Sequence, residues 1–544
     1  MTGRLCRAWP WLVALALAVV VLGPALAPGY VLRGDMVFVP RQPMKAAWWG
    51  LDGSVPRAVP MDGLVALLSS LVPGQVLQKV ALLGALVLAA TGAERMVRPA
   101  PWYARLGAMV VLVWNPWVQE RLLIGQWAIV LGYAVLPWVV VGVDALRSHD
   151  RAGLSVVRRW VPVAWPLALA AVASPSSGAV ALGVAVVLLV LRRPRPGWRV
   201  AARVTLLGGV LNLPWVVAAL RVPGGVGVGE GGFSGFAARA ESAAGLVPSL
   251  LSFGGIWKTS VVPEARTLGV VVVAGAVLTL VAVAALALAG RDPAGRAGYR
   301  RGLAVVAVGA FLLAWLPALG PVSGALDAIA RHVPGLALLR DSHRFLAPAV
   351  LLWAAGTAVL LTRLGAATRG SGVRAGTAGA ALVLVLTAPL LLAPQMAWGV
   401  GGTLRAVDYP AGWTTVAELL ERERAGSGDP DALVVLPWMG SYRGFAWNDR
   451  RAVLDPAPRF LPGTVLVDDR VYLEDRVLPS EDSRLAAVGR ALATRDPDRA
   501  AERLRALGVG WVLVHADHRV AVLPSGSPRW RGDGLLLLRL APAA

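Results

Sequence analysis

Residues 30–43 read YVLRGDMVFVPRQP and follow directly on an apolar run over residues 9–26. That run is long enough to cross a bilayer, so the stretch after it is predicted to be the first loop outside the membrane. A connecting loop needs turn residues, which a glycine and two prolines supply. It does not need a carboxylate among arginines, yet Asp35 stands between Arg33 and Arg41. The stretch therefore predicts a membrane protein whose first external loop carries chemistry at the membrane surface.

The composition also requires a bilayer. Of the 544 residues, 56% are hydrophobic and only 16% are charged, and the mean hydropathy is +0.63, outside the range of soluble domains. The net charge of +21 comes mostly from arginines in short clusters between apolar runs, which is the positive-inside pattern, so we expect no nucleic-acid partner. The single Cys6 excludes a disulfide within the chain, and the five histidines show no zinc spacing. The Arg-rich, Lys-poor usage is typical of a GC-rich bacterial genome.

About eleven apolar runs are predicted to be transmembrane helices. We place them near residues 10–28, 74–92, 105–117, 127–145, 160–176, 177–192, 204–220, 267–289, 302–319, 346–364 and 376–394. The third is short, and Asn115-Pro116 interrupts it. The first is interpreted as a retained span rather than a cleaved signal peptide, because a proline follows the candidate cleavage point.

The loops predict the orientation. Short, Arg-dense loops alternate with longer ones that carry less positive charge, and the Arg-dense loops are expected in the cytoplasm. Their arginines are Arg95, Arg98, Arg147, Arg151, Arg158, Arg159, Arg192, Arg193, Arg195, Arg199, Arg291, Arg296, Arg300, Arg301, Arg369 and Arg374. This pattern predicts a multi-pass plasma-membrane protein with a cytoplasmic N-terminus and an extracytoplasmic C-terminus.

The chain is predicted to divide into a membrane domain, 1–394, and an extracytoplasmic α/β domain, 395–544. External loops of the membrane domain are expected near 29–73, 221–266 and 320–345. In the second domain, DALVVLPW, WVLVH and GLLLLRL are predicted strands, and a helix is predicted from the N-cap Asp496 to Gly508. No nucleotide-binding glycine fingerprint is present.

Three polar clusters outside the predicted spans are candidates for function. They are the first loop, the segment WNPWVQERLLIGQW with Glu120 and Arg121, and the segment LLRDSHRFLAP with Arg340, His343 and Arg344. Each has a plain structural reading: an interfacial ion pair, a cap between two half-spans, and a helix start with lipid-headgroup contacts. In the first loop, MKAAWWGL is predicted to be an interfacial helix. His515 and His518 are interpreted as surface loop residues.

Taken together, the clusters predict a site. A carboxylate can remove the proton from an attacking sugar hydroxyl, and arginines can hold the phosphate of a lipid-linked donor. A second acid could bind a divalent cation or orient the acceptor.

The sequence resembles the GT-C-type polytopic membrane glycosyltransferases, most closely the actinobacterial arabinofuranosyltransferase-like proteins. RGDMVF, WNPWVQERLLIGQWAIVLGYAVLPW and LLRDSHRFLAP carry the resemblance, and RLRALGVGWVLVH is also similar to YfhO-type membrane proteins. The resemblance implies a polyprenyl-phosphate sugar donor and a cell-envelope glycan or glycolipid acceptor. It implies that Asp35 is the catalytic base or a metal partner, with Glu120 as the second acid.

The same resemblance also implies which residues bind the donor and the acceptor. Arg33, Arg41, Arg340, Arg344 and His343 are expected to bind the donor phosphate, and Trp438, Tyr442 and Trp447 to stack on the acceptor, although core packing explains these aromatic residues about as well. GT-C enzymes often show two adjacent acids in the first loop, whereas here Met36 follows Asp35. A divalent cation, Mg or Ca, and a metal-independent mechanism therefore both stay open.

We expect sugar transfer at the outer face of the plasma membrane. One alternative is a flippase or transporter of lipid-linked envelope precursors, which predicts charges within spans and repeated halves. Lys79 is the clearest charge in a predicted span, and no repeat is seen. The other alternative is a non-catalytic envelope scaffold, for which neutralising Asp35 would have no consequence.

Overall fold

The structure is a computed structural model that describes residues 2–147, 155–191, 198–222, 231–289, 297–333, 335–427, 431–473 and 477–540. The topology arginines Arg151, Arg192, Arg193, Arg195, Arg291 and Arg296 lie outside the described residues. The chain divides into two compact units: residues 1–24, 80–216 and 233–403 form the first, and residues 25–79, 217–232 and 404–544 form the second.

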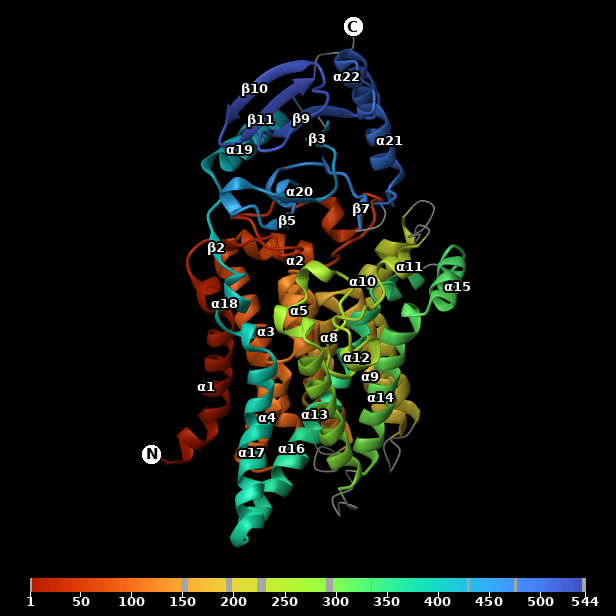
Figure 1. The fold of residues 1–544 in the computed structure, drawn as a ribbon. Helices are drawn as coiled ribbons and strands as arrows, with labels where there is room; N and C mark the ends of the chain where they lie inside the picture. The colour runs from red at the N-terminus through yellow and green to blue at the C-terminus, as the bar shows by residue number, and fades with distance from the viewer. Residues whose placement is uncertain are drawn as a thin grey trace. The chain divides into compact units, whose positions relative to one another are not determined.

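The first unit is built from helices that run side by side (Figure 1). They are α1 (Thr2–Leu22), α3 (Gly74–Met96), α4 (Trp102–Val113), α5 (Pro116–Leu123), α6 (Trp127–Ala134), α7 (Leu136–Arg147), α8 (Val156–Ala173), α9 (Pro175–Leu191), α10 (Trp198–Leu220), α11 (Gly232–Gly235), α12 (Leu246–Leu251), α13 (Gly269–Ala287), α14 (Ala297–Trp315), α15 (Gly320–Ala330), α16 (Ala349–Ala367), α17 (Gly372–Leu392) and α18 (Ala397–Gly402), some of which continue past the unit boundary. Short 3-10 helices join several of them.

Eight helical segments among the described residues are long and apolar enough to cross a membrane. They are Ala8–Leu26, Gly74–Met96, Trp127–Leu146, Trp198–Leu220, Gly269–Ala287, Tyr299–Ala318, Ser342–Ala367 and Gly372–Leu392. The other three predicted spans correspond to α4 with 12 residues, to α8, which starts beside two arginines, and to α9 with 17 residues. The helical membrane class is confirmed, whereas the count of about eleven spans stays a prediction.

The break expected at Asn115-Pro116 separates α4 from α5. The side chain of Asn115 accepts a hydrogen bond of 3.0 Å from the backbone N–H of Val118, and Pro116 occupies the first helical position. Both are helix-start signals, because the cap satisfies an unpaired N–H and proline has none to satisfy. The break starts the helix that carries Glu120 and Arg121.

The second unit contains a five-stranded sheet in the order β10-β11-β9-β3-β6. Its strands are β3 (Ala432–Leu436), β6 (Val465–Leu466), β9 (Val509–His515), β10 (Gly526–Gly532) and β11 (Leu535–Leu540). Strand β3 is parallel to β6 and β9, and β11 is antiparallel to β9 and β10. Smaller pairs are β4 (Tyr442–Gly444) with β5 (Ala452–Leu454) and β7 (Val471–Tyr472) with β8 (Val477–Leu478).

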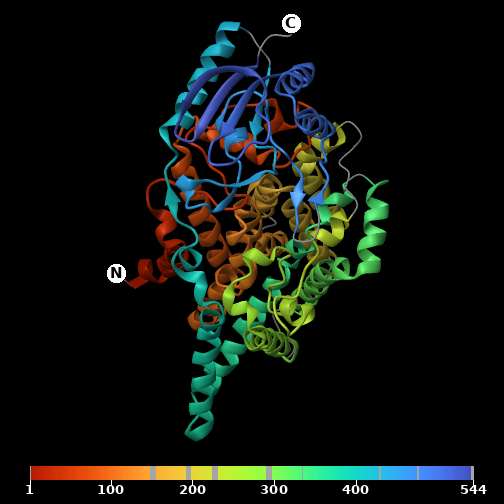
Figure 2. The same ribbon diagram turned by 45° about the horizontal axis from the view of Figure 1, so that its top comes forward.

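Helices cover the sheet. Side chains of α21 (Ser483–Leu492) and α22 (Pro497–Ala506) pack into the buried core formed by β3, β9 and β11, and Figure 2 shows these helices beside the strands. The helix α19 (Ala411–Ser427) contacts β11. The predicted strands in DALVVLPW, WVLVH and GLLLLRL and the helix capped by Asp496 are confirmed.

The first loop belongs to this second unit. Strand β1 (Tyr30–Val31) pairs antiparallel with β2 (Ala406–Val407). The backbone N–H of Gly34 donates to Ala452 O at 2.8 Å, and the N–H of Leu454 donates back to Gly34 O at 2.8 Å. The chain order alone therefore does not define this unit, and the boundary predicted at residue 395 stays a prediction. The expected interfacial helix in MKAAWWGL is a single 3-10 turn, Ala46–Trp49.

Candidate functional site

Asp35 lies on a tight turn of the first loop. The N–H of Met36 donates to Arg33 O at 2.9 Å, and Gly34 between them has a φ of +52°, a conformation that favours glycine. The hydroxyl of Tyr442, on β4, donates a hydrogen bond to Asp35 Oδ1. The turn is thus held by the backbone of β5 and by a side chain of β4, which together fix the direction of the carboxylate.

The surroundings of the turn are cationic. Arg33 is half-buried in the turn itself. Burial lowers the pKa of Arg451, and the charge of Asp449 opposes this shift. The positive charges of Arg405 and Arg33 lower the same pKa further. The three guanidinium groups therefore lie in one region. Sequence analysis missed Arg405 and Arg451 because they lie far along the chain in a segment without a motif.

Arg41, the other predicted phosphate ligand of this loop, is exposed and makes no hydrogen bond or ion pair with the described residues. It follows Asp35 on the same loop, outside the turn that Tyr442 holds. Its predicted role stays a prediction.

The three aromatic residues predicted to bind acceptor differ in exposure. Trp447 stacks on Phe445 with ring centroids 5.1 Å apart and lies 5.2 Å from Tyr409, within a cluster of aromatic rings. Trp438 packs against the buried core of the sheet. Tyr442 is exposed. Core packing accounts for the two tryptophans, so Tyr442 has the surface that an acceptor sugar would need.

In the first unit, Arg121 organises a buried ionic network. Its guanidinium binds Asp341 with two contacts of 2.9 and 3.2 Å and lies 2.8 Å from His343 Nδ1. Burial raises the pKa of Asp341, but the charges of Arg121 and Arg344 outweigh it and hold that pKa below its usual range. Because the bidentate pair is buried, it fixes the segment before α16 in place.

Glu120 is fully buried beside this network. His343 Nε2 lies 3.6 Å from Glu120 Oε2, and the carboxyl group of Glu241 is within hydrogen-bond reach. Burial raises the pKa of Glu120 well above its usual range, and the neighbouring Glu241 raises it further. The structure therefore brings Glu120, Glu241 and His343 together in a buried cluster.

Glu241 and Arg266 complete the network, and sequence analysis did not find them. The guanidinium of Arg266, on the 3-10 turn Glu264–Thr267, donates to Glu241 and also to Ser252 Oγ at 2.9 Å. Both residues come from the predicted loop 221–266, where no periodicity marks buried positions. Their ion pair is buried.

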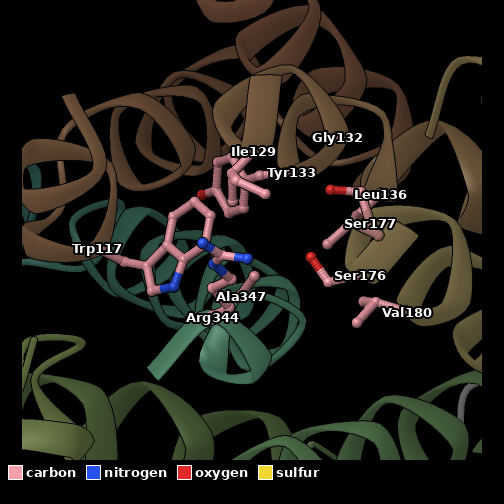
Figure 3. Close-up of a pocket in the computed structure, with 10 residues that line it drawn as sticks. All are labelled: Trp117, Ile129, Gly132, Tyr133, Leu136, Ser176, Ser177, Val180, Arg344 and Ala347. Carbon is pink, nitrogen blue, oxygen red and sulfur yellow. The ribbon is translucent and has the colours of Figure 1, made fainter. Parts of the chain in front are cut away.

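A pocket opens beside Arg344 (Figure 3). The rings of Trp117 and Tyr133 and the side chains of Ser176 and Ser177 line it, together with the apolar Ile129, Leu136, Val180 and Ala347. Arg344 makes one ion pair, Nε to Asp341 Oδ2 at 2.8 Å, and its terminal nitrogens have no hydrogen-bond partner among the described residues. The cavity volume is about 20 Å³, which is room for about one water molecule.

The pocket has the chemistry of an amphiphile site. Its lining combines a guanidinium and hydroxyl groups, which can hold an anion, with aromatic and aliphatic side chains. Arg340 lies elsewhere, with its guanidinium 5.0 Å from the ring centroid of Phe236. Of the predicted donor ligands in this unit, the structure brings only Arg344 to the pocket wall.

Among the described residues, no three His, Cys, Asp or Glu side chains are grouped so that they could hold a metal ion. The divalent cation stays a prediction of the resemblance, and we assign it no ligands.

Comparison with known proteins concerns the fold. No family model matches the sequence, and no curated protein sequence matches it. The structure is similar to the arabinofuranosyltransferase AftD from mycobacteria, with a TM-score of 0.63 and 17% identity over 100% of this chain. It is also similar to the oligosaccharyltransferase of Archaeoglobus fulgidus, with a TM-score of 0.51 and 11% identity over 95% of this chain.

The chain has a GT-C-type fold. This confirms the fold that the sequence resemblance predicted. The chain spans 40% of the length of the mycobacterial protein and 70% of the length of the archaeal one. At these identities the likeness concerns the arrangement of the elements, and the activity must be argued from the residues.

Proposed function

We propose that this GT-C-fold protein transfers a sugar from a polyprenyl-phosphate donor to a cell-envelope glycan or glycolipid at the outer face of the plasma membrane. The observation that carries the proposal is the Asp35 turn, in which Tyr442 orients a half-exposed carboxylate and Arg33 supplies positive charge. A carboxylate with a fixed direction is what a general base requires. The fold shared with two glycosyltransferases supports the reaction class.

In the proposed reaction, Asp35 accepts the proton of the acceptor hydroxyl as its oxygen attacks the anomeric carbon of the donor sugar. A new C–O bond forms, the bond from the anomeric carbon to the phosphate oxygen breaks, and its electron pair leaves with the phosphate. A guanidinium group stabilises the negative charge that develops on this leaving group. Arg33, in the same turn as Asp35, is the candidate for this role.

The Arg344 pocket supports a lipid-linked donor rather than a soluble one. A nucleotide sugar is polar throughout, whereas this pocket sets a guanidinium and serine hydroxyls against aliphatic walls. The chemistry of this lining suits the junction between a phosphate and an isoprenoid chain, and such a ligand would have to widen the pocket to enter it.

Glu120 is buried away from solvent, so we assign it a positioning role. Its carboxyl group lies against His343, whose other ring nitrogen contacts Arg121. In this position Glu120 acts on the donor site through His343 and not by direct proton transfer.

A flippase for lipid-linked precursors is the second candidate. The buried network of Glu120, Arg121, Glu241, Arg266 and Asp341 favours it, because ionisable groups inside helical membrane proteins often mark a transport path. Both candidates handle the same class of lipid, so the experiment must separate transfer from translocation.

The test uses purified full-length protein in detergent, a polyprenyl-phosphate sugar and an oligosaccharide acceptor. Arabinofuranose is the first sugar to try, because the mycobacterial neighbour is an arabinofuranosyltransferase. We expect an extended acceptor with the lipid-linked donor and none with a nucleotide sugar. No product from any lipid-linked donor, together with movement of the lipid across reconstituted vesicles, would overturn the transferase and support the flippase.

A further inference from the structure

We infer that the face formed by Met439, Tyr442, Tyr472 and Val477, here named the tyrosine face, binds the acceptor glycan. In this inference Tyr472 holds a sugar next to the one that reacts at Asp35. The inference rests on the proposed function and adds the residue that selects an oligosaccharide over a single sugar. All four side chains are exposed, Tyr442 at 39% and Tyr472 at 51%.

The two tyrosines are brought together by a close approach at Gly440. A Cβ atom built on Gly440 would lie 3.0 Å from Tyr472 Cε2 and 3.1 Å from its Cδ2, so the ring rests directly on the glycine backbone. Tyr442 follows two residues later, within about 7 Å along an extended chain. The ring of Tyr472 therefore lies beside the strand whose tyrosine contacts Asp35.

The carboxylate of Asp468 contacts both the backbone at Gly440 and the arginine that lies beside the Tyr472 ring. Asp468 accepts a hydrogen bond from Gly440 N at 2.7 Å and from the guanidinium of Arg470 at 2.7 and 2.9 Å. The Arg470 guanidinium carbon in turn lies 5.7 Å from the ring centroid of Tyr472. The aromatic ring is thus set in place before a ligand arrives, which lowers the entropy cost of binding.

The chemistry of the face fits a sugar chain. An aromatic ring offers an apolar surface for the C–H side of a sugar, while Asp35 and Arg470 offer polar groups for its hydroxyls. A membrane surface is the other class of partner for exposed aromatic residues. The fixed directions of the Asp35 carboxylate and of the Tyr472 ring favour a sugar, whose hydroxyl groups and C–H face have defined positions.

The experiment measures binding of a synthetic arabinofuranose tetrasaccharide and of maltotetraose to the purified full-length chain by calorimetry, and acceptor KM where transfer is seen. Tyr472→Ala removes the ring, and Tyr472→Phe keeps it. Leu523→Ala truncates another exposed apolar side chain of the same unit and serves as the matched control. We expect Tyr472→Ala to raise the Kd of at least one tetrasaccharide about ten-fold, with the Phe variant and the control unchanged.

Each outcome decides the inference. Binding that is equal in wild type and Tyr472→Ala, or absent in the wild type, overturns it. Transfer by wild type with an unchanged acceptor KM in Tyr472→Ala overturns the tyrosine face alone. Binding through Tyr472 without transfer of any sugar keeps the face and overturns the transferase.

Discussion

At the residue scale, the pocket beside Arg344 depends on a single cation. Its Nε lies 2.8 Å from Asp341 Oδ2 in an ion pair, and its side chain lines the pocket. The pocket wall opposite is made of hydroxyl groups and aliphatic carbon. An anionic lipid headgroup would therefore meet one planar donor group in a largely apolar setting, where a charge-assisted hydrogen bond is strong.

Replacing Arg344 tests that dependence. We expect Arg344→Ala to raise the KM for the polyprenyl-phosphate donor at least about ten-fold, since one charge-assisted contact is worth about 1.5–3 kcal/mol. Arg344→Lys keeps the positive charge but lacks the planar guanidinium that donates two parallel hydrogen bonds, so it should recover part of the loss. The matched control is Arg374→Ala, an exposed arginine at the start of α17. A donor KM that is equal in all variants would remove Arg344 from the donor site.

Asp455 illustrates a buried charge in the second unit. It contacts Arg443, His515 Nε2 at 3.0 Å and the N–H of Ala457 at 2.9 Å. His515 is therefore buried at the end of β9, and its interpretation as a surface loop residue is wrong. Burial raises the pKa of Asp455, but the charges of His515 and Arg443 outweigh burial and hold it below its usual range. The carboxylate therefore neutralises the arginine inside the core.

Asp455→Asn leaves Arg443 buried without a counter-charge, and we expect it to lower the free energy of unfolding of the second unit by about 3–5 kcal/mol at neutral pH. Because the folded pKa is depressed, the stabilisation is present above the unfolded pKa of about 3.9 and is lost as the pH falls through the folded pKa. Denaturant unfolding followed by tryptophan fluorescence measures both effects. A difference between variant and wild type that stays constant from pH 7 to pH 3 would contradict the charge argument.

At the scale of elements, the break between α4 and α5 positions the ionic network. Asn115 caps α5, and its amide also donates to Val111 O at 2.9 Å and to Tyr133 OH at 3.2 Å. One side chain thus ends one helix and starts the next. The direction of α5 sets the place of Glu120 and Arg121.

Asn115→Ala should lower the stability of the first unit by about 1–2 kcal/mol, because an unsatisfied cap typically costs this much. Asn115→Ser keeps a good capping oxygen and should recover most of the loss. Thermal unfolding in detergent compares the three proteins. Equal midpoints for the Ala and Ser variants would show that capping is not what Asn115 contributes.

Sequence reading succeeded for elements with local signals. The strand DALVVLPW, the Asp496 cap and the Asn115-Pro116 break all depend on neighbours in the chain, and the structure contains them. It failed for the interfacial helix, where four residues form only one 3-10 turn. Glu241, Arg266 and the Ser176–Ser177 wall were missed because their partners come from other segments.

At the scale of the whole molecule, the first loop and the C-terminal residues form one folding unit. The hydrogen bond from Tyr442 to Asp35 joins positions 407 residues apart, and backbone bonds from Gly34 to β5 support it. No periodicity or motif reports a contact at that separation, so the sequence could name both residues but not their link. The sequence predicts Asp35 as the base and Tyr442 as an acceptor-binding residue, without a contact between them.

This arrangement predicts the effect of a truncation. A chain ending at residue 403 lacks β2, β4 and β5, so residues 30–41 lose their partner strands. We expect trypsin to cleave the truncated protein after Arg33 or Arg41 at least about ten-fold faster than the full chain, because local unfolding controls cleavage. Equal cleavage rates would show that the first loop keeps its structure without the C-terminal residues.

The most direct measurement of the central claim is the transfer rate of four full-length proteins: wild type, Asp35→Asn, Tyr442→Phe and Asp52→Asn. Asp52 is an exposed acid of the same loop, and among the described residues its carboxylate accepts hydrogen bonds from the N–H and hydroxyl of Ser54. The account predicts loss of transfer in Asp35→Asn by a factor of about 100 or more, a smaller loss in Tyr442→Phe, and a normal rate in Asp52→Asn. Wild-type rates in a folded Asp35→Asn protein would contradict it.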